Sequence, residues 1–82
     1  MEGIVLAGDN GQYRRWLYKN KRRVQDYKYV YNYESIAGYR DTQIYLIGSY
    51  FFRKDYEKIL EYCKSNNIKV RSGYFIAKSE VK

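Results

Sequence analysis

The chain has 82 residues, with sixteen lysines and arginines against nine aspartates and glutamates, which gives a formal net charge of +7. A chain this short supports one hydrophobic core, so we expect a single domain over residues 1–82 with its core in residues 3–71. One cysteine and no histidine exclude a disulfide framework, a Cys/His zinc site and a histidine-based catalytic triad. No bound metal or cofactor is expected.

Targeting signals are not expected either. The N-terminal apolar run over residues 4–7 is too short for a signal peptide, and no stretch approaches the length of a transmembrane helix. We therefore expect a cytoplasmic protein that does not engage a membrane and keeps its cysteine reduced.

The start of the chain predicts a buried strand followed by a helix. Residues 3–7 form a continuous apolar run, which is typical of a strand covered on both faces. Apolar residues then recur at helical spacing over residues 11–22. Asp9 or Asn10 precedes this helix as its candidate cap, and Gln12 has the spacing from Asp9 that a capping box requires.

The remaining elements continue the alternation of strands and helices. A tyrosine-rich segment predicts the second strand, a polar segment holds one helical turn, and two further apolar runs flank a second amphipathic helix. Residues 72–82 are expected to form an edge strand or an ordered tail, with a fifth strand over 73–77. In chain order, the other predicted elements are the strand 27–33, the turn 35–37, the strand 42–47, the helix 53–65 and the strand 68–71.

Strands that alternate with helices favour a parallel sheet with right-handed crossovers. The predicted fold class is therefore α/β, a small Rossmann-like parallel sheet of about four strands with two main helices. A ferredoxin-like α+β sheet shares part of this element order and is the alternative.

A strand order of 2-1-3-4 would place a ligand crevice between the carboxyl ends of the first and third strands. The loops 8–12 and 48–53 would line it, and each begins with a glycine that lets a ligand approach the backbone. The first loop leads into a helix N-terminus, which favours an anion. The alternative is that these are ordinary turn glycines beside solvated arginines. The predicted ligand-binding residues are Gly8, Asp9, Asn10, Gln12, Arg14, Arg15, Gly48, Ser49, Tyr50 and Arg53.

A second candidate site is a cluster of cations in and after the first helix. Seven cations and one acid, Asp26, fall within fifteen residues, so few of the cations have an acidic partner nearby in the sequence. Such an excess favours an anionic partner, although a solvated helix face is the alternative. The predicted basic surface comprises Arg15, Lys19, Arg22, Arg23 and Lys28, and the cluster also includes Arg14 and Lys21.

Tyrosine accounts for twelve residues of the chain. Tyr27, Tyr29, Tyr31 and Tyr33 alternate along the predicted second strand and would share one face. On an edge strand this stripe would stack on bases, whereas beneath a helix it would be ordinary core. Cys63 falls on the apolar stripe of the second helix and is predicted to be core.

Catalysis is not expected. Asp9, Asp41 and Asp55 lie near predicted strand ends, and Ser49 is a candidate nucleophile. Their spacing matches no base–nucleophile pair and no metal-ligand cluster, so caps and turns explain them equally well.

Two segments, IVLAGDNGQYRRWL and LIGSYFFRKDYEKI, resemble the corresponding parts of small phage-encoded Rossmann-like proteins, most of which have no assigned activity. The likeness covers about residues 3–70, and Gly11 and the basic run 19–23 depart from the pattern. It implies a viral or mobile-element origin and action in the host cytoplasm. The matching positions are Gly8, Asp9, Gln12, Gly48, Ser49, Tyr50 and Arg53.

The expected function is that of a non-enzymatic protein that captures an anionic nucleotide or nucleic acid, to evade host defence or assist phage DNA metabolism. The main alternative is an inhibitor that binds an acidic host protein, one that itself handles nucleic acid or takes part in defence. A third hypothesis is a nucleotide-processing enzyme that uses Asp9 and Ser49. A second copy of the chain is a further candidate partner.

Overall fold

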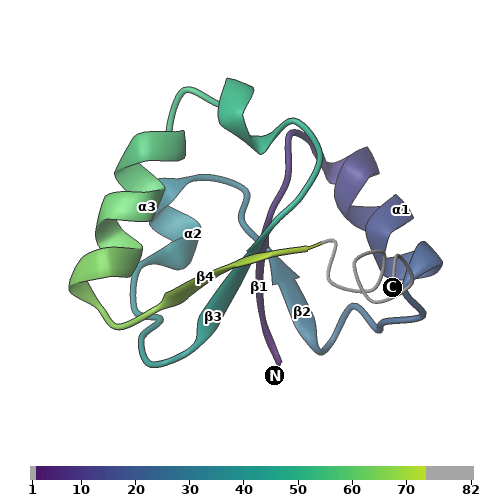
Figure 1. Ribbon diagram of the computed structural model, residues 1–82, viewed down its shortest axis with the longest axis horizontal. Helices are drawn as coiled ribbons and strands as arrows, with labels where there is room; N and C mark the ends of the chain where they lie inside the picture. The colour runs from purple at the N-terminus through teal and green to yellow at the C-terminus, as the bar shows by residue number, and fades with distance from the viewer. Residues whose placement is uncertain (1, 74–82) are drawn as a thin grey trace, which may run out of the picture.

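The computed structural model describes residues 2–73, which form one four-stranded sheet with helices on both faces (Figure 1). The strand order is β2-β1-β3-β4, and the three pairings are all parallel. The predicted parallel α/β fold is therefore confirmed, and the ferredoxin-like alternative, which needs antiparallel pairs, is wrong. The strands are β1 (Gly3–Leu6), β2 (Tyr27–Tyr29), β3 (Gln43–Leu46) and β4 (Lys69–Ser72).

The helices are divided between the two faces of the sheet. Figure 1 shows α1 on one side of the strands and α2 and α3 on the other. Right-handed crossovers explain this division, because the chain steps one way from β1 to β2 and the opposite way from β2 through β3 to β4. The helical elements are α1 (Asn10–Lys19), α2 (Tyr33–Ile36), the 3₁₀ turn η1 (Tyr50–Phe52) and α3 (Tyr56–Ser65).

The central strand β1 is buried on both faces, as its continuous apolar run predicts. Ile4 and Leu6 join the core under α2 and α3, whereas Val5 and Ala7 join the core under α1. Cys63 lies in the first of these cores, as predicted, and burial raises the pKa of its thiol to about 11.

Aromatic rings form most of the core beneath α1. The Trp16 ring lies 5.4 Å from that of Tyr27 and 5.9 Å from that of Tyr45, measured between ring centres. Trp16 Nε1 donates to the carbonyl of Gly73 at 2.6 Å, and the Tyr13 hydroxyl donates to the carbonyl of Tyr27. Tyr13, Tyr27 and Tyr45 are therefore core residues, and the buried hydroxyl of Tyr13 has a backbone partner.

The second strand is shorter than predicted. It ends at Tyr29, and α2 begins at Tyr33 because Asn32 and Ser35 form a reciprocal capping box. This local capping outweighs the β-propensity of the tyrosine-rich segment. The prediction of a strand over residues 27–33 is therefore wrong in its second half. The prediction that four tyrosines share one face of this strand is wrong for the same reason.

Other boundaries differ by a few residues. Helix α1 ends at Lys19 rather than at residue 22, because Asn20 caps it and Lys21 takes a left-handed φ of 53°. Helix α3 begins three residues later than predicted because η1 precedes it. The predicted turn at 35–37 lies at 33–36, and the fourth strand ends at Ser72. The predicted fifth strand and tail lie outside the described residues, apart from residues 72 and 73.

Candidate functional site

The carboxyl ends of β1 and β3 lie side by side, as the predicted ligand crevice requires. The side chain of Gln12 occupies the space between them. Its Oε1 accepts hydrogen bonds from the backbone N–H groups of Gly8, at 2.8 Å, and Ser49, at 3.0 Å. Its Nε2 donates to Ser49 Oγ at 2.9 Å. Gln12 thus links the two loops that the sequence assigns to a ligand.

The glycines of these loops make room for Gln12. A Cβ atom at Gly8 would lie 2.7 Å from Gln12 Oε1, and one at Gly48 would lie 2.1 Å from the same atom. Gly48 also has a φ of 57°, which disfavours other residues. The cap predicted for α1 is present, since Asp9 Oδ1 accepts from the backbone N–H of Gln12 at 2.8 Å. The Gln12 side chain, however, bonds across the crevice instead of completing a capping box.

A Gln12→Ala variant is expected to lose about 1–2 kcal/mol of unfolding free energy, because two half-buried N–H groups lose their acceptor. Gln12→Glu keeps an acceptor oxygen and adds a negative charge near a helix N-terminus, so it should be at least about 1 kcal/mol more stable than Gln12→Ala. Urea unfolding followed by circular dichroism measures both. Equal stability of the two variants would show that the bridge contributes little.

The Arg53 side chain makes hydrogen bonds inside the protein and is not available to a ligand in the crevice. Its Nη1 donates to the carbonyls of Ala7, at 3.1 Å, and Val30, at 2.7 Å, and its Nη2 donates to the carbonyl of Tyr31 at 2.8 Å. Asp55 accepts from Nε at 3.1 Å and from Nη2 at 3.2 Å. All five guanidinium N–H donors are thus engaged, and only 11% of the side chain is exposed. Arg53 therefore joins β1 and β2 to the segment before α3.

Of the remaining residues predicted to line the crevice, some pack against the core and others are exposed to solvent. Tyr50 is half-buried and packs against the core beneath α3, with its ring 5.5 Å from that of Tyr56. Asn10 is exposed at the first position of α1. The enzyme hypothesis assigned catalysis to Asp9 and Ser49. In the structure Asp9 caps the N-terminus of α1, and Ser49 accepts a hydrogen bond from the Gln12 side chain.

A row of exposed cations covers the outer face of α1 and the loop after it. Tyr13, Trp16 and Leu17 are buried beneath the helix, so the residues between them point outward. Tyr18, in the middle of this outward face, is 85% exposed. We call this surface the cationic face and define it as the exposed residues Arg14, Arg15, Lys19, Lys21 and Arg23.

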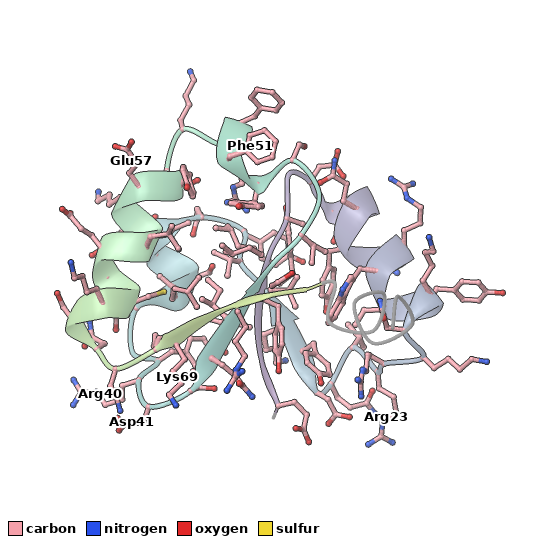
Figure 2. All side chains as sticks on the ribbon, in the orientation of Figure 1. Arg23, Arg40, Asp41, Phe51, Glu57 and Lys69 are labelled. Atoms are coloured by element: carbon pink, nitrogen blue, oxygen red, sulfur yellow. The ribbon has the colours of Figure 1, made fainter. Side chains whose placement is uncertain are left out.

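Few of these cations have acidic partners. Among residues 2–73 the ion pairs are Arg23–Asp26, at 3.2 Å, and Arg53–Asp55, at 3.1 Å, so only one member of the cationic face is paired. Arg23 is labelled at the end of this surface in Figure 2. Two predicted members lie apart from the face. Arg22 is half-buried with its guanidinium 5.8 Å from the centre of the Tyr27 ring, and Lys28 is exposed on the edge strand β2.

A shallow hollow of about 340 Å³ lies at the amino ends of β3 and β4, away from the crevice. In Figure 2 the labels of Asp41 and Lys69 mark this end of the sheet, whereas Phe51 marks the opposite end. The sequence does not predict this hollow, because its residues come together only through the pairing of β3 with β4. Its lining residues are Asp41, Thr42, Gln43, Asn67, Lys69 and Arg71.

Within residues 2–73, no three His, Cys, Asp or Glu side chains are close enough together to hold a metal ion. No helix in the same range has the length and apolar character needed to cross a membrane.

Comparison of the chain with protein-family models, with curated proteins and with solved structures finds no match. The resemblance to small phage-encoded proteins therefore stays a prediction. Any assignment of function depends on the geometry and charge of the molecule itself.

Proposed function

We propose that the protein binds nucleic acid through the cationic face of α1. The observation that carries this proposal is the row of exposed lysines and arginines, which within residues 2–73 has one acidic partner, Asp26. Lysines and arginines that neutralise phosphates release condensed counterions, and this release favours binding. A face whose charges were already paired would gain much less.

The shape of the cationic face favours a polymer over a small nucleotide. Arg15 and Lys19 are one helical turn apart, about 6 Å along the axis, and Lys21 and Arg23 extend the row beyond the helix. A row of this kind matches phosphates that repeat along a strand. The crevice that would suit one compact phosphate group is instead occupied by Gln12 and bordered by the fully engaged Arg53.

The resemblance to phage-encoded proteins gives this proposal a biological setting. A basic phage protein in the host cytoplasm would bind phage or host nucleic acid, either in DNA metabolism or to evade host defence. Catalysis is not part of the proposal, because the Asp9 carboxylate accepts from the backbone N–H of Gln12 and the Ser49 hydroxyl accepts from the Gln12 side chain.

The test is a charge reversal with a matched control. The first variant carries Arg14→Glu, Arg15→Glu and Lys19→Glu, and the control carries Arg40→Glu, Lys54→Glu and Lys64→Glu, which are exposed elsewhere. Both variants change the net charge equally. Fluorescence anisotropy with an oligonucleotide of about 12 nucleotides, in about 50 mM salt, measures affinity.

The variant of the cationic face should lose at least about 100-fold in affinity, and the control less than about tenfold. The slope of log K against log salt should also fall by about 2–3 for the first variant, since three phosphate contacts disappear. Equal losses would place the contact elsewhere. If the unmodified protein binds no oligonucleotide, the proposal is withdrawn in favour of an acidic protein partner.

A further inference from the structure

An exposed tyrosine stands at the open edge of the sheet, near the start of the cationic face. Within the described residues β2 pairs with β1 alone, so it forms an edge of the sheet. Tyr31 follows β2 at its carboxyl end and is 70% exposed. An aromatic ring in such a position offers a free face on which a base can stack.

Tyr31 is the outermost ring of an ordered aromatic row. Tyr13 of α1 stacks on Tyr29 of β2 with ring centres 5.1 Å apart, and Tyr29 meets Tyr31 edge to face at 4.9 Å. Arg53 fixes the backbone at this point by donating to the carbonyl of Tyr31 at 2.8 Å. A ring supported in this way loses little conformational freedom when a ligand stacks on it.

The aromatic row adjoins the cationic face. Tyr13 belongs to the aromatic row through its stacking on Tyr29, and Arg14 is the next residue of α1. The row therefore begins where the cationic face begins. A strand bound by its phosphates along the cationic face would pass the Tyr13 end of this row, with the Tyr31 ring two ring contacts away.

We propose that the cationic face binds single-stranded nucleic acid, with one base stacked on Tyr31; this inference rests on the proposed function. In a duplex the faces of the bases are covered by their neighbours, so an exposed ring has nothing to stack on. In a single strand every base has a free face. DNA and RNA share this chemistry, and the test compares them.

The test separates base stacking from charge. Four labelled probes are titrated: single-stranded DNA and RNA of about 12 nucleotides, a DNA of the same length in which every position is abasic, and the corresponding duplex. The variants are Tyr31→Leu, which removes the ring, and Tyr31→Phe, which keeps it. Phe52→Leu is the matched control, because Phe52 is 80% exposed on η1, outside the cationic face.

Tyr31→Leu should weaken binding of single-stranded DNA or RNA by about fivefold to 150-fold, which corresponds to roughly 1–3 kcal/mol for one stacked base. Tyr31→Phe and Phe52→Leu should change it by less than about twofold. The abasic strand and the duplex should bind more weakly than the single strand and should not respond to Tyr31→Leu. If DNA and RNA respond alike, the 2′-hydroxyl takes no part; if only one responds, that polymer is the ligand.

Two results would overturn the inference and leave the proposed function standing. One is a duplex that binds as tightly as the single strand, and the other is an equal response of the abasic and normal strands to Tyr31→Leu, with both still sensitive to charge reversal on α1. If charge reversal on α1 has no effect, or if no probe binds, the inference and the proposed function both fail. Melting temperatures of the variants confirm that each one is folded.

Discussion

Replacing Arg53 with alanine is expected to lower the free energy of unfolding by about 3–5 kcal/mol. The buried carbonyls of Ala7 and Val30 would lose a charged donor, and Asp55 would lose its ion pair. Hydrogen bonds to charged groups contribute about 1.5–3 kcal/mol each, against a total stability of roughly 5–15 kcal/mol for a typical domain. Urea unfolding of the variant measures the loss.

The matched control for this experiment is Lys54→Ala, since Lys54 is the next residue and is exposed. Its stability should change by less than about 0.5 kcal/mol. The structure assigns Arg53 to the fold, so a stable Arg53→Ala protein with reduced nucleotide affinity would contradict that assignment. Such a result would indicate that Arg53 binds a ligand in the crevice, as the sequence predicts.

Introducing a carboxylate at Val5 is expected to prevent folding altogether. Val5 is fully buried in the central strand, in the core cluster beneath α1, whose members are apolar or aromatic. An unpaired buried charge costs several kcal/mol, and the lost valine packing adds to that cost, so the sum approaches the whole stability of a small domain. The Val5→Asp protein should lack a cooperative unfolding transition in calorimetry.

Val70→Asp makes the same substitution on the edge strand β4, where Val70 is 50% exposed. Its carboxylate stays in water, so the loss should remain below about 1 kcal/mol. A cooperatively melting Val5→Asp protein, or equal damage from the two substitutions, would mean that β1 is not the buried centre of a parallel sheet.

The elements that the sequence predicts most accurately are those with a strong local signal. The apolar run of β1 is continuous because helices cover both faces of that strand, and only one kind of strand has this pattern. The cap at Asp9 was predictable because a carboxylate before a helix satisfies a free N–H group. The prediction for the tyrosine-rich segment was wrong because it used β-propensity alone. The hydrogen bonds between Asn32 and Ser35 start a helix there instead.

The candidate ligand crevice has a sequence pattern that fits two different structures. Glycines after two strands and an arginine beside them are typical of a phosphate site, and the same residues also suit a crevice closed by the protein itself. The choice depends on Gln12 reaching Ser49, thirty-seven residues away, at 3.0 Å. Only the pairing of β1 with β3 brings these residues together.

The parallel α/β fold could be predicted from the amino-acid sequence, because alternating apolar strands and amphipathic helices allow few other arrangements. The helical part of the cationic face, Arg14, Arg15 and Lys19, was also predictable, since residues that alternate with the apolar ones on a helix point outward. The tertiary structure alone decided that Arg53 supports the fold and that Tyr31 stands exposed beside α1. Both depend on how side chains pack once the strands have paired, and the spacing of residues in a sequence does not specify that packing.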